Sequence, residues 1–198
     1  QQEKIRDKID TAIAKVLDHG TYIMGPEVKE FENNIAQYTG AKHAISCSSG
    51  TDALSMALMA LGVKAGDGIL VPSFTFAATA ETVALLGAIP VFVDVTKDTF
   101  NMCVADIARA IDESTSKGLS VKGIIPVDLF GQPADYQAID AIAEKHNMWV
   151  LSDAAQSLGA SIDGKQVGTF GICTATSFFP AKPLGCYGDG GCIFTDND

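Results

Sequence analysis

The sequence predicts an α/β fold, in which a mostly parallel β-sheet carries helices on both faces. Three observations support this prediction. The 198 residues are 47% hydrophobic and 19% charged, which suits one globular domain or a large part of a two-domain protein. Five segments of strand length are almost continuously apolar, as strands buried on both faces are. Four of these five segments are followed by a segment with helical periodicity, the alternation that builds parallel sheets.

Two helices are expected first, over residues 8–20 and 25–40, and in the second Pro26 can occupy the first turn while Gly40 ends the helix. The alternation begins after them. The expected strands cover residues 43–47, 68–74, 89–95, 123–130 and 148–155. The expected helices between them cover residues 48–62, 77–88, 104–112 and 135–146. After residue 160 the pattern changes to glycine turns and short strands at 174–179 and 191–196.

Composition argues against several classes of protein. No apolar run reaches the roughly 18 residues that a membrane helix needs, and the polar amino end lacks the apolar core of a signal peptide. A net charge of -10 would repel nucleic acid. The five cysteines form no C-x-x-C pair, and the three histidines show no metal-ligand spacing. We expect a cytoplasmic protein with free thiols that binds no metal, membrane or nucleic acid.

Ligands of such sheets bind beyond the carboxyl ends of the strands, so the residues at those ends are the first candidates for a site. The stretch "SSGTDAL" joins a predicted strand to a predicted helix. Gly50 lets the backbone approach a ligand there, and Ser49 or Thr51 can add a hydroxyl to the free amides of the helix. This stretch predicts an anion site, although an ordinary helix cap would have the same sequence.

Two further strand ends carry candidates. Asp153 in "VLSDAAQS" follows an apolar strand, where a carboxylate either caps a helix or holds the ring nitrogen of a basic cofactor protonated. Phe74 and Phe76 in "PSFTFAA" are either core aromatics or rings that stack on a flat cofactor.

The stretch "TATSFFPAKPLGCYGDGGC" contains one lysine, Lys182, between two aromatic residues and a run of glycines. Taken alone, it could be a surface lysine in a turn. Together with a carboxylate, an anion site and an aromatic face, it completes the set that pyridoxal 5'-phosphate requires. We therefore predict this cofactor.

These motifs, together with "IIPVDLFGQPADYQAI", resemble those of the DegT/DnrJ/EryC1/StrS family of sugar aminotransferases, in order over nearly the whole chain. The resemblance implies the aspartate-aminotransferase fold (fold type I of the pyridoxal-phosphate enzymes). It also implies transfer of an amino group from glutamate, which leaves as 2-oxoglutarate, to a nucleotide-linked keto-sugar.

The resemblance implies two catalytic residues: Lys182, which forms a Schiff base with the cofactor, and Asp153, which faces the pyridine nitrogen. It further implies that Gln156 lies near the phenolic oxygen. The remaining implied contacts are those of Phe76 with the ring face and of Gly50, Thr51 and Ser177 with the phosphate.

The sequence departs from the family pattern at Ser152, where an acid is common, and at Gly68, and neither position is expected to touch the chemistry. Members of the family continue into a smaller carboxyl-terminal domain and work as homodimers. Residues 1–198 are therefore expected to be a truncated pyridoxal-phosphate-binding large domain, inactive alone.

Two alternatives to an aminotransferase remain: an inactive truncated scaffold, and a pyridoxal-phosphate-dependent sugar dehydratase of the same fold. Such dehydratases carry histidine in place of the lysine, so Lys182 argues against them. The stretches "QPADYQAI" and "SFFPAKPLGCYGDGG" are most similar to aminotransferases for the 3-keto group of a UDP-linked N-acetylated uronic acid, used for surface polysaccharide. Members of the family that act on 4-keto sugars share much of the sequence of these two stretches.

Overall fold

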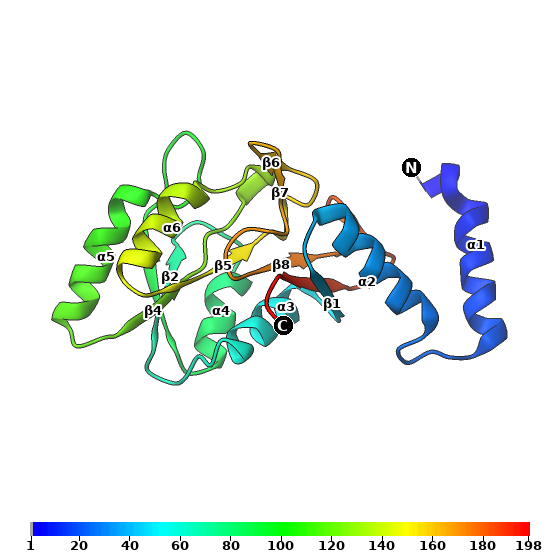
Figure 1. Cartoon of the computed structure of the whole chain (residues 1–198), viewed down its shortest axis with the longest axis horizontal. Helices are drawn as coiled ribbons and strands as arrows, with labels where there is room; N and C mark the ends of the chain where they lie inside the picture. The colour runs from blue at the N-terminus through cyan, green and yellow to red at the C-terminus, as the bar shows by residue number, and fades with distance from the viewer. Residues whose placement is uncertain (1) are drawn as a thin grey trace.

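The computed structural model describes residues 2–198 and has a seven-stranded sheet at its centre (Figure 1). The strands lie in the order β1 (His43–Cys47), β9 (Gly191–Thr195), β8 (Cys173–Ser177), β5 (Trp149–Asp153), β4 (Val121–Ile124), β2 (Gly68–Pro72) and β3 (Ile89–Val93). β9 is antiparallel to both of its neighbours, and all other pairs are parallel. Every strand except β9 therefore points its carboxyl end to the same edge of the sheet.

Helices connect these strands and precede them. Their bounds are α1 (Gln2–His19), α2 (Pro26–Thr39), α3 (Gly50–Ala60), α4 (Ala78–Leu85), α5 (Val104–Ser116) and α6 (Tyr136–Lys145). A short 3-10 helix, η1, covers Leu129–Gly131, and a small hairpin is formed by β6 (Ser161–Ile162) and β7 (Lys165–Gln166). None of the helices within residues 2–198 has the length and apolar character to cross a membrane.

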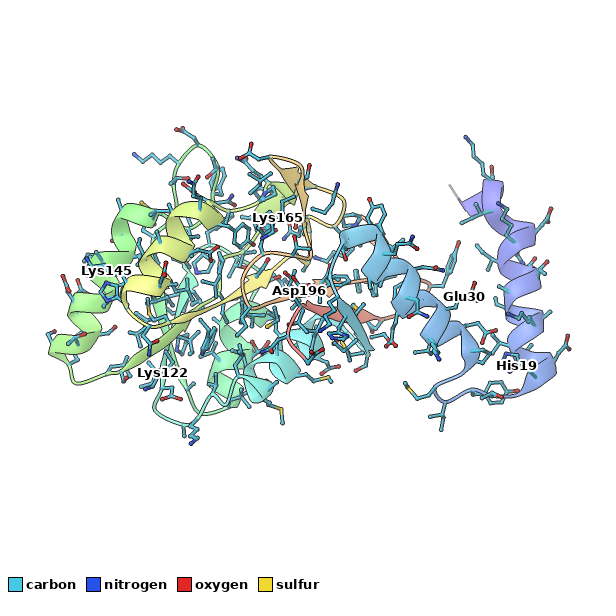
Figure 2. All side chains as sticks on the ribbon, in the orientation of Figure 1. His19, Glu30, Lys122, Lys145, Lys165 and Asp196 are labelled. Carbon is cyan, nitrogen blue, oxygen red and sulfur yellow. The ribbon has the colours of Figure 1, made fainter. Side chains whose placement is uncertain are left out.

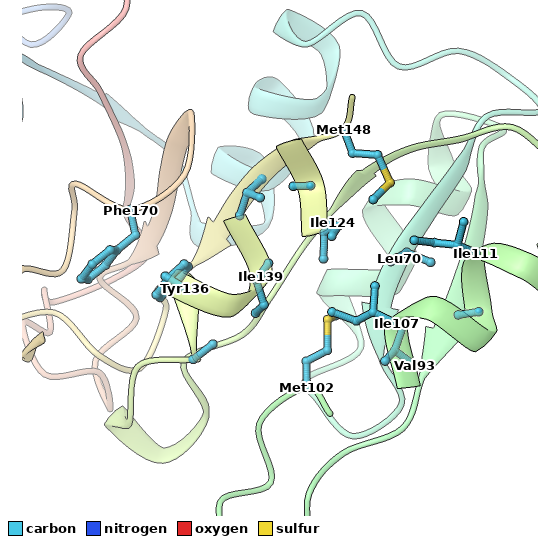
Figure 3. Close-up of a cluster of buried hydrophobic side chains, with 14 of the residues drawn as sticks. Leu70, Val93, Met102, Ile107, Ile111, Ile124, Tyr136, Ile139, Met148 and Phe170 are labelled. Atoms are coloured by element: carbon cyan, nitrogen blue, oxygen red, sulfur yellow. The ribbon is translucent and has the colours of Figure 1, made fainter. Parts of the chain in front are cut away.

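Helices cover both faces of the sheet, as predicted. Leu70 of β2 points to the face covered by α5 and α6, where it joins Ile107 and Ile139 in one buried cluster (Figure 3). Its neighbour Ile69 points to the other face, where it packs with Leu58 of α3 in a second cluster. This alternation explains why the strands are apolar almost throughout, because both sides of each are buried.

The sequence alone predicts no strand order, and the structure places β1 at the edge of the sheet, where it pairs only with β9. Two predicted boundaries need correction. The strand expected over 123–130 ends at Ile124, because Pro126 lacks the N–H that would continue the ladder. The first helix is longer than 8–20 and begins at Gln2.

α1 stands apart from the sheet, beyond α2 (Figure 1). Its contacts with α2 are polar: Lys15 Nζ lies 3.1 Å from a carboxylate oxygen of Glu27. His19, labelled in Figure 2, also contacts Glu27. Apolar side chains of this region remain exposed, including Leu17 at 62% and Ile23 at 87%. The described residues therefore leave an apolar surface around α1 uncovered.

Candidate active site

A cavity of about 790 Å³ opens at the edge of the sheet where the parallel strands end. Its size is typical of a pocket for a small organic ligand. All of the residues predicted to contact a cofactor line it: Gly50, Thr51, Phe76, Asp153, Gln156, Ser177 and Lys182. The structure therefore brings together residues from four separate strand ends.

The predicted anion site lies at the start of α3. Ser49 caps this helix, because its hydroxyl accepts a hydrogen bond from the Asp52 amide at 3.0 Å. The amides of Gly50 and Thr51 belong to the first turn and have no partner within the helix. Gly50 also lies against Ser177, since a Cβ at position 50 would lie only 2.6 Å from the Cβ of Ser177. The close approach that glycine permits thus places the Ser177 hydroxyl beside free amides.

Asp153 ends β5 and is only 5% exposed. One of its oxygens accepts a hydrogen bond from the hydroxyl of Thr79 at 2.8 Å, and the other accepts one from the amide of Ala155 at 3.2 Å. No helix begins there, so Asp153 is not a helix cap. Burial raises the pKa of its carboxyl, while the two hydrogen bonds and the charge of Lys182 act in the opposite direction. A cation placed next to this carboxylate would be favoured strongly.

Thr79 is a residue that the sequence analysis missed. It is fully buried on α4, and its hydroxyl lies 2.9 Å from that of Thr75, which also lines the cavity. Because the Thr79 proton goes to Asp153, Thr75 is the donor to Thr79. Nothing local in the sequence signals the contact with Asp153, since 74 residues separate the two.

Lys182 is half-buried in the loop that joins β8 to β9 and lines the cavity. Backbone hydrogen bonds hold the loop: Phe178 N–H to Gly190 O at 2.7 Å, Cys186 N–H to Phe178 O at 2.8 Å, and Lys182 N–H to Phe179 O at 2.8 Å. The predicted tight backbone is therefore present, and these hydrogen bonds hold the backbone of Lys182 in place.

The two aromatic candidates lie in different places. Phe76 lines the cavity and is 70% exposed. Phe74 does not line it, and its ring packs instead against those of Phe100 and Phe130, with centroids 5.4 and 6.4 Å away. Interpretation of the pair as core aromatics is therefore wrong, because Phe74 too is about half exposed. Of the two candidates, only Phe76 lines the cavity.

Phe130 is a further cavity residue that the sequence analysis missed. Its backbone has φ 57°, in the left-handed region that bulky residues avoid at a cost of about 1–3 kcal/mol. Its amide donates a hydrogen bond of 2.9 Å to Oε1 of Gln156. This bond orients the Gln156 side chain at the cavity wall.

The cavity lining has little charge. Lys182 is its only basic residue, and Asp153 and Asp189 are the acidic ones. Within residues 2–198, no three histidine, cysteine or acidic side chains come together as metal ligands would. The departure at Ser152 lies outside the lining, where its hydroxyl hydrogen-bonds that of Tyr136.

Comparison with known proteins assigns the chain to a family. A sequence profile of the DegT/DnrJ/EryC1/StrS aminotransferase family matches residues 3–198. The UDP-2-acetamido-2-deoxy-3-oxo-D-glucuronate aminotransferase of Pseudomonas aeruginosa is 54% identical over 198 residues, which are 100% of this chain and 54% of that protein.

Solved structures agree with this assignment. A DegT DnrJ EryC1 StrS aminotransferase from Brucella abortus has a TM-score of 0.98 and 53% identity, covering 100% of this chain and 53% of that one. DesV of S. venezuelae, in complex with a ketimine intermediate, has a TM-score of 0.93 and 39% identity, covering 99% and 51%. The fold is therefore the one that the resemblance implied, and the chain spans about half the length of these relatives.

Proposed function

Because the chain belongs to the DegT/DnrJ/EryC1/StrS aminotransferase family, we propose that it forms the pyridoxal-phosphate-binding part of a sugar aminotransferase. In this proposal glutamate gives its amino group to a nucleotide-linked keto-sugar and leaves as 2-oxoglutarate. One observation carries the proposal: the amine of Lys182, the buried carboxylate of Asp153 and the free amides at the start of α3 line the same cavity.

The donor set fits pyridoxal 5'-phosphate group by group. The amides of Gly50 and Thr51 and the hydroxyl of Ser177 would bind the phosphate, since a helix amino terminus favours an anion. Asp153 would bind the protonated ring nitrogen, which supplies the cation that its buried carboxylate lacks. Phe76 would lie on the ring face.

Gln156 would face the phenolic oxygen. Its Oε1 already accepts the Phe130 amide, which leaves its NH₂ group free to donate. The direction of this amide therefore suits an acceptor in the cavity.

When bound, the cofactor supplies an electron sink for the carbon whose hydrogen is removed. Lys182 would first hold the cofactor through its amine. Once the amino donor displaces it, the free amine of Lys182 would act as a general base and acid that moves a proton between the α carbon of the donor and the C4' carbon of the cofactor. Asp153 would keep the ring nitrogen protonated while this happens.

Reduction with borohydride tests the role of Lys182. Protein incubated with pyridoxal phosphate and then reduced should carry the label on the peptide that contains Lys182. Lys165 is the internal control, because it lies on the β6–β7 hairpin with its Nζ 5.1 Å from the ring centroid of Phe170 (Figure 2). Label on Lys165 with Lys182 unmodified would contradict the proposal.

We further propose that the sugar is UDP-linked and carries a 3-keto group on an N-acetylated uronic acid, for surface polysaccharide. The 54% identity with the Pseudomonas aeruginosa enzyme supports this choice. The whole protein should produce 2-oxoglutarate from glutamate with the UDP-linked 3-keto sugar. Turnover of a UDP-linked 4-keto sugar alone would overturn the 3-keto assignment, and failure with every nucleotide sugar would overturn the substrate class.

The described residues do not build a complete substrate site in this proposal. The diphosphate of a nucleotide sugar needs cations, and Lys182 is the only one in the cavity lining. We propose that residues 1–198 are the large domain of a cytoplasmic enzyme that acts as a homodimer. The remaining cations would then come from a further domain or from the second subunit.

A further inference from the structure

Asp128 is a second buried acid at the carboxyl edge of the sheet, and it does not line the cavity. It is fully buried beside Asp153, whose backbone oxygen accepts the Asp128 amide at 3.0 Å. A buried carboxylate is costly unless donors surround it, so the partners of Asp128 indicate what it does.

Three neutral donors meet the Asp128 carboxylate. One oxygen accepts the amide of Ala134 at 2.9 Å and the hydroxyl of Tyr136 at 2.7 Å. The other accepts the hydroxyl of Ser157 at 2.7 Å. The Tyr136 ring is itself fixed, because it stacks on Phe170 with centroids 4.4 Å apart and planes within 5° (Figure 3).

Two of these donors, Ala134 and Ser157, belong to the two segments that meet at the cavity wall, and the third, Tyr136, begins α6. Ala134 ends the turn that carries Phe130, and Ser157 directly follows Gln156. The same two turns meet again at the cavity, where the Phe130 amide bonds to the Gln156 side chain. Asp128 thus links Ala134 and Ser157, which are buried, while Phe130 and Gln156 of the same two segments line the cavity.

We propose that Asp128 is a positioning residue, whose carboxylate holds the Phe130 and Gln156 turns together so that Gln156 faces the cofactor. It acts through Ser157 on one side and through Ala134 on the other. The left-handed backbone of Phe130 needs such support, because an unsupported turn would relax away from it. The cofactor readout below rests on the function proposed above, whereas the backbone readout does not.

The test compares four variants of the purified protein. Asp128→Ala removes all three contacts, and Ser157→Ala removes the one nearest Gln156. Asp128→Asn is the conservative variant, since an amide can still accept from Ala134 and Tyr136 and can donate to the Ser157 hydroxyl. Asp140→Asn is the control, because Asp140 is an exposed acid of α6 outside the cavity.

The first readout is amide hydrogen exchange without cofactor. In Asp128→Ala we expect the Phe130 amide to exchange about tenfold faster or more, although Asp128 does not touch it. Asp128→Asn should restore most of the protection, and Asp140→Asn should match the wild type. If Asp128→Ala does not fold, exchange of the Phe130 amide is measured in Ser157→Ala instead. An exchange rate of the Phe130 amide equal to that of the wild type, in whichever of these two variants is measured, would overturn the proposal.

The second readout is the affinity and absorption maximum of bound pyridoxal phosphate. We expect about tenfold weaker binding and a shifted maximum in Asp128→Ala, with recovery in Asp128→Asn. A variant that lowers only the melting temperature, with cofactor affinity and spectrum unchanged, would show that Asp128 is merely structural. If the wild type bound no pyridoxal phosphate, the proposed function would fail, while the exchange of Phe130 would still report on Asp128.

Discussion

Replacing Gly50 by alanine adds a single methyl group but should weaken the binding of pyridoxal phosphate strongly. The new Cβ would lie 2.6 Å from Cβ and 3.1 Å from Oγ of Ser177. Carbon atoms in contact prefer about 3.5–4.0 Å, so one of the two segments must move by roughly 1 Å. Either movement separates the Ser177 hydroxyl from the amides at the start of α3.

The expected magnitude follows from this overlap. Extra methyl groups in a packed site cost about 1–3 kcal/mol. If that cost falls on the bound state, the affinity for the phosphate group drops by about 5- to 150-fold. Titration of the purified protein with pyridoxal phosphate, followed by absorbance, measures the change directly.

Gly188→Ala is the matched control. Gly188 lies in the loop of Lys182, and a Cβ there would meet nothing within 4 Å. This variant should bind the cofactor as the wild type does. An affinity of Gly50→Ala within about twofold of the wild type would refute the steric reasoning and the assignment of this turn to the phosphate.

Three other predictions concern charge and exposed surface. Asp153→Asn should keep the fold and part of the cofactor affinity but lose most transamination, because a neutral amide cannot hold the ring nitrogen protonated; near wild-type turnover would show a purely structural role. Burial raises the pKa of Asp128 from 3.8 to about 6, so between these values the native chain holds a proton that the unfolded chain has lost. As the pH rises through this window, this carboxyl lowers the free energy of unfolding by about 3 kcal/mol in all. Between about pH 4 and pH 7, the free energy of unfolding measured in urea should therefore fall less, or rise more, in Asp128→Asn than in the wild type, and an equal change in both would contradict the shift. Residues 1–198 alone should be inactive and should associate through exposed side chains such as Leu17 and Ile23; a monomer with glutamate-dependent turnover would contradict this.

Local patterns were sufficient for most of the fold. The strand at His43–Cys47 was predicted with its observed bounds, because a short apolar run between a glycine turn and small residues has few alternatives. The place of that strand in the sheet could not be predicted. The alternation of strand and helix suggests neighbours in sequence order, whereas β1 pairs only with β9, a strand that runs the opposite way.

The same division holds for the site. The cavity position of residues at strand ends, such as Asp153 and Gly50, could be predicted because ligands of this fold class bind at that edge of the sheet. Thr79 could not, because its role depends on which residue of α4 reaches the end of β5 in the folded chain. Asp128 could not, because it fell inside the strand expected over 123–130, and only its buried donors identify it as a positioning acid.

The reversed strand β9 also determines when the cavity can form during synthesis. β1 has no other strand partner, and the amide of Lys42 beside it bonds a carboxylate of Asp196, 154 residues later in the chain. At about 5–20 residues per second, a ribosome takes roughly 8–30 s to make that length. Until then β1 has no strand to pair with in the sheet. The loop of Lys182 and the proposed phosphate site beside β1 are therefore completed late, and we expect the growing chain to retain no cofactor before its sheet is closed.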